Sequence, residues 1–189
     1  MEFCLSNQKA ISMHTSYLLL GGNKGDVLAI FREALRMFPE AGLQVVAQSS
    51  IYQSEPWGMD NTTPWFYNQV IKVRTNKKAA ELLNAILDIE KALGRSRKPG
   101  IMDSRTIDID ILLFNNAVIA IPGLVIPHPR MHLRRFALTP LHEIAPGMVH
   151  PVLKQTVRQL LTDCKDPLVV EKAPDFPVTG NQIQNTSQP

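Results

Sequence analysis

The residues best suited to chemistry lie in the segment 105–114, which reads RTIDIDILLF. On a strand, residues two apart share a face, so Asp108 and Asp110 would point the same way, about 7 Å apart, while the isoleucines point into the core. Two neighbouring carboxylates repel each other and resist burial. Magnesium, a hard cation with oxygen ligands, would compensate them. The alternative is a solvated strand face with two surface aspartates, and the pair alone does not decide between the two.

A cationic loop precedes this strand. The segment 94–100 reads GRSRKPG and supplies Arg95, Arg97 and Lys98, and Arg105 follows. Guanidinium groups beside metal-binding carboxylates are the parts that phosphoryl transfer needs. Plain surface ion pairs would use the same residue types. The glycines and the proline would let this loop act as a mobile lid.

A second basic cluster lies in the segment 126–136, which reads IPHPRMHLRRF. Two prolines hold His128 in an extended conformation. Three arginines, among them Arg134, follow within seven residues, which suits the binding of phosphate oxygens. A basic surface hairpin is the alternative interpretation.

Aromatic residues gather between Ser54 and Asn68. Trp57 lies in the loop SEPWG, and Trp65, Phe66 and Tyr67 directly precede Asn68. Alternation places Phe66 and Asn68 on one strand face, where stacking and hydrogen bonding together suit a flat heterocycle. A core aromatic cluster is the alternative.

The elements that must position these clusters alternate along the chain. Patterning predicts strands at 17–20, 43–52, 66–74, 106–114 and 117–120, and helices at 26–38 (stopped by Pro39), 77–93 (ended by Gly94), 134–144 (interrupted by Pro140) and 157–161. The core order β-α-β-β-α-β predicts an α+β fold of the ferredoxin-like sandwich type, with both helices on one face of an antiparallel sheet and an additional C-terminal hairpin and helices.

Composition sets the outer limits. The chain has 189 residues, of which 44% are apolar and 20% charged, and a net charge of +3. This length and composition predict a single catalytic domain over 16–172, between a disordered extension (1–15) and a disordered tail (173–189). Two cysteines and no long apolar run favour a cytoplasmic protein without a membrane span. The weak positive charge suits an anionic ligand and gives little support to nucleic-acid binding.

The clusters occur together in an order that resembles the 6-hydroxymethyl-7,8-dihydropterin pyrophosphokinase family. The resemblance covers about 16–151 and includes G-R-x-R, S-R-T-I-D-I-D-I-L-L-F and I-P-H-P-R-M-x-x-R-x-F. The shorter motifs L-G-x-N, E-P-W-G, F-x-N and P-L-x-E-I-A-P fall in register with them. The resemblance implies transfer of pyrophosphate from ATP to a hydroxymethyl dihydropterin, with AMP as the second product, in folate biosynthesis.

The resemblance also implies roles for individual residues. Asp108 and Asp110 would hold two Mg²⁺ ions, and Arg95 and Arg105 would act on the transferring group. ATP would contact Glu90, Arg97, His128 and Arg134, and the pterin would contact Ser54, Trp57, Phe66, Asn68 and Phe136. Asp110 is the candidate for any general base.

The chain departs from the family pattern in the lid. Many relatives have Arg-Trp-Gly-Pro where this sequence has Ile101-Met102-Asp103-Ser104. An aromatic residue and an arginine are therefore missing, and Asp103 adds negative charge, so lid closure and the rate are expected to differ.

Two other functions use similar parts. Another magnesium-dependent phosphotransferase would share the carboxylates and arginines but release ADP or phosphate. An RNA-binding ferredoxin-like module would need an aromatic RNP pattern, which the sequence lacks. We expect ATP and the pterin as partners, no nucleic acid or membrane, and a monomer, with a weak homodimer as the alternative.

Overall fold

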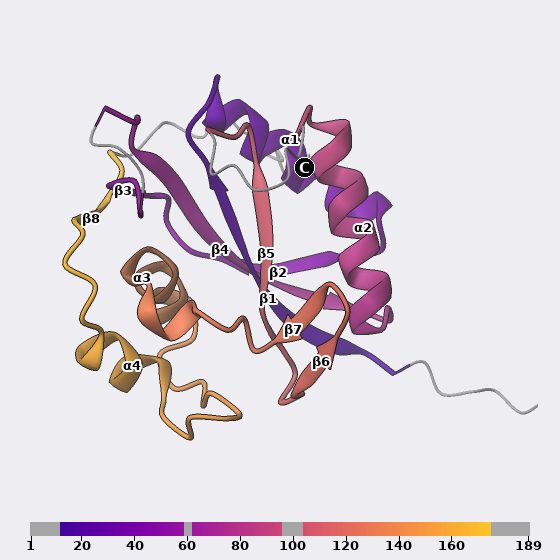
Figure 1. The fold of residues 1–189 in the computed structure, drawn as a ribbon. Coiled ribbons are helices and arrows are strands. Elements are labelled where there is room, and N and C mark those ends of the chain that lie inside the picture. The colour runs from indigo at the N-terminus through magenta and orange to yellow at the C-terminus, as the bar shows by residue number, and fades with distance from the viewer. Residues whose placement is uncertain (1–11, 59–61, 96–103, 175–189) are drawn as a thin grey trace, which may run out of the picture.

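An antiparallel sheet of six strands forms the centre of the computed structural model, which describes residues 12–58, 62–95 and 104–174 (Figure 1). Strands run in the order β5-β1-β4-β3-β8, and β2 pairs with the far half of the β4 edge that β3 also uses. Their bounds are β1 His14–Gly22, β2 Gln44–Gln48, β3 Tyr52–Ser54, β4 Phe66–Thr75, β5 Asp108–Phe114 and β8 Val170–Lys172. A separate hairpin joins β6 (Ile119–Ile121) to β7 (Leu124–Ile126).

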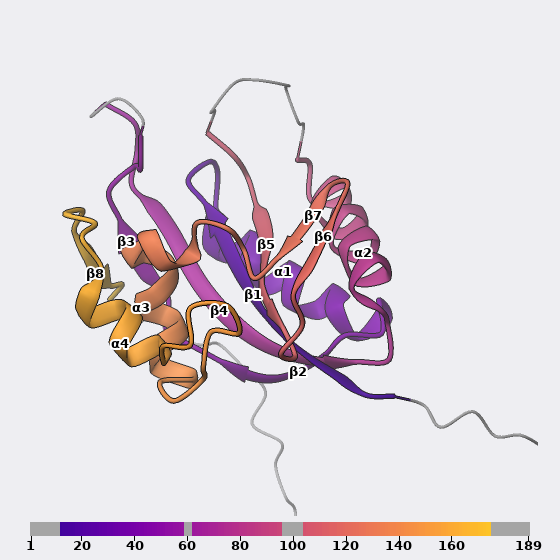
Figure 2. The same cartoon turned by 60° about the horizontal axis from the view of Figure 1, so that its bottom comes forward.

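Helices cover both faces of the sheet. Figure 2 shows α1 (Val27–Glu40) and α2 (Ala79–Ala92) on one face, and α3 (Arg135–Ile144) and α4 (Val157–Asp163) on the other. Side-chain alternation explains the two cores, because Leu18 and Leu20 of β1 pack toward α1 and α2 while Leu19 packs toward α3. A short 3₁₀ helix, Met131–Leu133, leads into α3.

Most predicted elements form, with shifted ends. Asp26 caps α1 by accepting a hydrogen bond from the Ala29 N–H at 2.9 Å. The helix α2 ends at Ala92, and Gly94 follows its C-cap residue with a φ of 80°, which glycine adopts without steric cost. The expectation that Pro39 stops α1 after Phe38 was wrong, since Pro39 lies inside the last turn and the helix ends two residues later than expected, at Glu40.

Two predicted elements differ more clearly. The strand expected over 43–52 is split into β2 and β3, because the Ser49 hydroxyl takes the Val70 N–H at 3.0 Å and interrupts the ladder. The expected interruption of α3 at Pro140 was wrong, since the helix runs through it to Ile144.

The predicted terminal boundaries also shift. β1 starts at His14, so the last two residues of the expected extension lie in the sheet. Ala173, assigned to the disordered tail, is buried and donates its N–H to the Ile51 carbonyl at 2.9 Å. Residues 1–11 and 175–189 lie outside the described ranges. In the described part of the chain, no helix has the length and apolar character to span a membrane.

Candidate active site

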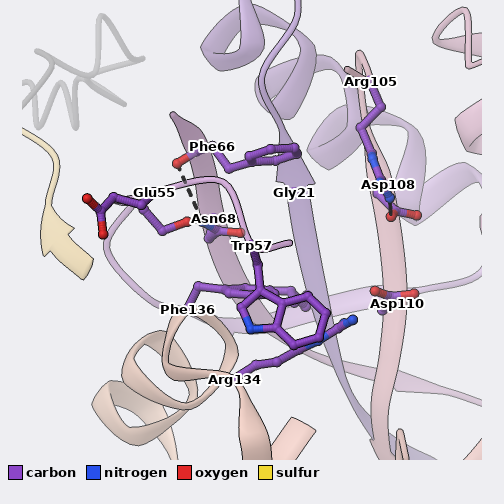
Figure 3. A pocket seen from close by; sticks show the side chains of 12 residues that line it. Gly21, Glu55, Trp57, Phe66, Asn68, Arg105, Asp108, Asp110, Arg134 and Phe136 are labelled. Atoms are coloured by element: carbon purple, nitrogen blue, oxygen red, sulfur yellow. Dashed lines mark hydrogen bonds and ion pairs between the residues drawn. The ribbon is translucent and has the colours of Figure 1, made fainter. Parts of the chain in front are cut away.

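The sheet register brings the acidic strand beside the predicted pterin residues. Gly21 of β1 pairs with Asn68 of β4 on one side and with Asp108 of β5 on the other. The side chains in this row face α3, and Gly21 has none, so the floor between the amide and the carboxylate stays open. A pocket opens over this floor (Figure 3).

The acidic strand alternates as the sequence predicts. Ile107, Ile109 and Ile111 are buried in the core shared with α1 and α2. Asp108 and Asp110 face the pocket on the opposite side of β5. The prediction that the two carboxylates share one face is therefore confirmed in geometry.

Asp108 is held by two arginines. The Nη1 atoms of Arg95 and Arg105 each contact one of its carboxylate oxygens. Burial alone would raise the pKa of Asp108, but the two guanidinium groups outweigh it and hold that pKa below its ordinary value. Asp108 is thus ionised at neutral pH, and both arginines are already positioned beside it.

Glu90 lies behind this group. Its side chain is 2% exposed, and Oε1 accepts hydrogen bonds from Arg95 Nη1 at 2.6 Å and from the Ile109 N–H at 2.7 Å. Glu90 therefore anchors Arg95 and the start of β5. A direct contact between Glu90 and a nucleotide, expected from the resemblance, stays a prediction.

Asp110 contrasts with Asp108, because it makes no hydrogen bond or ion pair with any residue in the described ranges. Burial, helped by the neighbouring charge of Asp108, raises the pKa of Asp110 to about 6. The attraction of Arg134 only partly offsets this. Within the described part of the site, the negative charge of Asp110 therefore has no direct partner.

Arg134 lies between two aromatic rings. Its guanidinium carbon is 4.8 Å from the centroid of the Trp57 ring and 5.5 Å from that of Phe136. Its Nε is buried and has no hydrogen-bond partner among the residues that the structure describes. Burial, together with the nearby charge of Arg130, lowers the pKa of Arg134 below its ordinary value. An anion near Asp110 would find a guanidinium that is already desolvated and oriented.

Aromatic and amide side chains line the remainder of the pocket. Figure 3 shows Phe66 and Phe136 on opposite sides, with Asn68 between them. The Asn68 amide donates to Ser54 Oγ at 2.9 Å, and both residues are buried. Arg105 lies over the Phe66 ring at 5.9 Å. A flat heterocycle could therefore stack between the two phenyl rings and meet an oriented amide.

His128 is fixed by its backbone. Its N–H donates to the Leu112 carbonyl at 2.9 Å, and its Nδ1 accepts from the Arg130 N–H at 3.2 Å. Burial and then the charges of Arg134 and Arg130 lower the pKa of His128 to about 4. The imidazole is thus neutral at pH 7, and because Nδ1 accepts, Nε2 is left as the donor.

The structure brings most predicted site residues together. Those that line this one pocket together are Ser54, Trp57, Phe66, Asn68, Arg105, Asp108, Asp110, Arg134 and Phe136. Arg95 and Glu90 form the layer beneath Asp108. His128 does not line the pocket. Arg97 and the divergent lid positions 101–103 lie outside the described residues.

Sequence reasoning missed three residues that line the pocket, Leu19, Gly21 and Glu55. Gly21 belongs to the L-G-x-N motif and Glu55 to E-P-W-G, so both lay within recognised motifs, but only the register of β1 against two other strands gives Gly21 its place. The next residue, Gly22, packs so tightly that a β-carbon there would lie 2.6 Å from the Thr106 carbonyl oxygen.

Comparisons with known proteins agree on one family. The family described as 7,8-dihydro-6-hydroxymethylpterin-pyrophosphokinase (HPPK) matches residues 17–146. The chain is 38% identical to the 2-amino-4-hydroxy-6-hydroxymethyldihydropteridine pyrophosphokinase of Methylorubrum extorquens, over 85% of this chain and 99% of that protein. It is 37% identical to the protein of the same name from Aquifex aeolicus, over 78% of this chain and 90% of the relative.

Solved structures support the fold. A crystal structure of Plasmodium falciparum HPPK-DHPS with pteroate superposes with a TM-score of 0.64 at 18% identity. The match covers 80% of this chain but 42% of that longer chain. The mixed α/β architecture with an antiparallel sheet is thus shared with an HPPK-containing protein.

Proposed function

We propose how the residues of this chain carry out the reaction of its family. The chain belongs to the 7,8-dihydro-6-hydroxymethylpterin-pyrophosphokinase family and transfers pyrophosphate from ATP to 6-hydroxymethyl-7,8-dihydropterin in folate biosynthesis. The observation that carries the proposal is the row Asn68, Gly21 and Asp108 across three neighbouring strands. This row places the proposed pterin site directly beside Asp108 and Asp110, the carboxylates proposed to bind the ATP phosphates through magnesium.

The pterin occupies the space between Phe66 and Phe136. Both rings offer stacking faces, and Asn68, oriented by Ser54 Oγ, meets the polar edge of the heterocycle. Backbone groups near Ser54 and Trp57 supply further hydrogen bonds. In this orientation the hydroxymethyl group points across Gly21 toward β5.

Replacing Asn68 with alanine tests this assignment. We expect Asn68→Ala to raise the KM for the pterin about 30-fold and the KM for ATP less than about threefold. The reason is that the buried polar edge of the pterin would lose its hydrogen-bond partner, whereas ATP would lose no contact. Steady-state kinetics with each substrate varied in turn would measure both constants. Asn84→Ala, an exposed change on α2, is the matched control. Equal changes in both constants would contradict the assignment.

Asp108 and Asp110 fit magnesium. They offer hard oxygen ligands on one face of β5, and the raised pKa of Asp110 indicates a negative charge that a cation would relieve. No cluster of three or more His, Cys, Asp or Glu side chains within the described ranges is arranged to hold a metal. Phosphate oxygens and water would therefore complete the coordination. When bound between these carboxylates and the phosphates, two Mg²⁺ ions would neutralise phosphate charge and make the β-phosphorus more electrophilic.

Asp110 makes metal binding depend on pH. Because its pKa is about 6 without metal, protons compete with magnesium below that pH, whereas Asp108 stays ionised. We expect the dissociation constant for Mg²⁺, measured by calorimetry without nucleotide, to rise about tenfold between pH 7 and pH 5. In Asp110→Ala, binding should be weaker and independent of pH over this range. Constant affinity of the wild-type protein would show that Asp110 is not a ligand.

The arginines stabilise the transferring group. Arg95 and Arg105 are already held at Asp108. Their remaining N–H donors can therefore hydrogen-bond to phosphate oxygens with little further loss of side-chain conformational freedom. Arg134, Arg97 and the neutral His128 are assigned to the other ATP phosphates. The hydroxymethyl oxygen attacks the β-phosphorus, the bond from that phosphorus to the α-phosphate oxygen breaks, and AMP leaves. Asp110 is our candidate for accepting the hydroxyl proton.

Labelled ATP distinguishes this reaction from other phosphotransfers. With ³²P at both the β and γ positions, both labels should appear in the pterin product and none in the nucleotide. Retention of the β label in ADP would overturn the proposed site of attack.

We also propose the finer classifications that the residues and topology support. The order β1-α1-β2-β4-α2-β5, with α1 and α2 on one face of an antiparallel sheet, supports a ferredoxin-like class, extended by the β6-β7 hairpin, α3 and α4. A single catalytic domain that includes His14 and Ala173, a cytoplasmic location and a monomeric state, with a weak homodimer as the alternative, complete the proposal.

A further inference from the structure

A segment beyond the family match joins the two walls of the pocket. The match ends at residue 146, yet residues 164–173, here named the C-terminal strap, run from the start of α3 to the outer edge of β3. Figure 1 shows β8, α3 and α4 gathered beside β3. One end of the strap meets the helix that carries Phe136, and the other meets the strand that carries Ser54.

At the first wall, Asp166 takes the place of a missing helix cap. The N-cap residue of α3 is Arg134, whose side chain makes no capping hydrogen bond. The buried Asp166 supplies the acceptor instead, with its Oδ2 2.9 Å from the Arg135 N–H. A carboxylate at the N-terminus of a helix also interacts favourably with the helix dipole.

Side-chain contacts strengthen this junction. Arg135 Nε donates to the Asp166 carbonyl at 3.0 Å, and its Nη2 donates to the Cys164 carbonyl at 3.2 Å. The other carboxylate oxygen of Asp166 accepts the Leu168 N–H at 3.2 Å, which turns the strap toward the sheet. Asp166 therefore determines both the first turn of α3 and the direction of the strap.

At the second wall, the strap pairs with β3 and the loop after it. Val170 pairs with Ser54 in an antiparallel ladder. Glu55, which lines the pocket, donates its N–H to the Val169 carbonyl at 3.2 Å and accepts the Val169 N–H at 2.9 Å. Ser54 in turn orients Asn68. The strap is thus hydrogen-bonded at one end to Arg135, the residue before Phe136, and at the other end to Ser54, which contacts Asn68.

We propose that Asp166 is a positioning residue for the pterin: by capping α3 and turning the C-terminal strap, it sets the spacing between Phe136 and the Ser54–Asn68 wall. This inference rests on the proposed placement of the pterin. The ATP side has its own supports, since the Arg134 N–H bonds to the Met131 carbonyl at 3.3 Å and His128 is fixed to Leu112. Loss of Asp166 should therefore affect the acceptor more than ATP.

Asp166→Ala tests the proposal. We expect the pterin KM and the pterin dissociation constant each to rise about tenfold, with the ATP KM changed less than about twofold. Quenching of tryptophan fluorescence, with Trp57 at the pocket, would measure pterin binding without turnover. Asp163→Ala removes the same charge from an exposed position three residues earlier and should bind pterin normally.

Asp166→Asn keeps one acceptor oxygen and should show a smaller rise of about threefold, and it decides the matter if the alanine variant does not fold. A purely structural role would lower the melting temperature while leaving both KM values of the folded enzyme unchanged. Wild-type pterin affinity in the folded Asp166 variants would overturn the inference. Absence of pterin binding by the wild-type protein would instead overturn the proposed pterin site.

Discussion

Asp110→Ala is expected to lower kcat/KM by at least about 10³-fold while the fold persists. Asp110 faces the pocket beside Asp108 and has no hydrogen-bond or ion-pair partner among the described residues. A metal supplies several kcal/mol of transition-state stabilisation, and each 1.36 kcal/mol is about tenfold in rate. Losing one of two protein ligands should remove most of that contribution. Turnover at saturating ATP and pterin, with magnesium varied, measures the loss.

The same substitution, Asp110→Ala, should leave the stability of the fold without metal unchanged or increase it. Folding raises the pKa of Asp110 to about 6, so its ionised form opposes folding. This penalty is present above pH 6 and vanishes as the pH falls below the ordinary value of 3.8. Without metal, Asp110→Ala should therefore unfold at the same or a higher temperature than wild type at pH 7. Asp88→Ala, an exposed carboxylate on α2, controls for the loss of charge. Near-normal turnover by folded Asp110→Ala would refute the metal assignment.

Arg105→Ala is expected to lower kcat about 10²- to 10³-fold, the usual scale for one electrostatic donor at a transition state. Arg105 contacts Asp108 and lies over Phe66, so it stands between the metal ligands and the acceptor. Both KM values should change less than about threefold. Pre-steady-state measurement of the chemical step would separate this loss from slower product release.

The same substitution should not weaken metal binding. Removing Arg105 takes one of two positive charges from Asp108, so affinity for Mg²⁺ without nucleotide should rise. Arg36→Ala, at an exposed position on α1, is the matched control. An unchanged kcat with a raised ATP KM would mean that Arg105 serves ground-state binding instead.

The acidic strand could be predicted from sequence because its information is local. Alternation of isoleucine and aspartate places one set in the core and the other toward the pocket, and no distant contact overrides this. The helices α1 and α2 were equally clear from their apolar spacing and ends. Their boundaries shifted by a few residues, as at Pro39, where the last turn of α1 accommodates the ring.

Features that depend on register or on distant contacts could not be predicted. The row from Asn68 through Gly21 to Asp108 requires two strand pairings at once. β8 is three residues long and exists because β3 offers it an edge. The burial of Glu90 beneath Arg95 follows from the packing of α2 on β5, which helical periodicity alone does not specify.

The central claim is that Asp108 and Asp110 support magnesium-dependent pyrophosphate transfer at this pocket. The most direct measurement follows AMP and ADP formation from ATP and 6-hydroxymethyl-7,8-dihydropterin as magnesium is raised from zero, in wild type and in Asp108→Asn. We predict AMP in equal amount to the pterin pyrophosphate, a strict need for magnesium, and loss of both products in the variant. ADP as the product, AMP formed without magnesium, or full activity in folded Asp108→Asn would contradict the account.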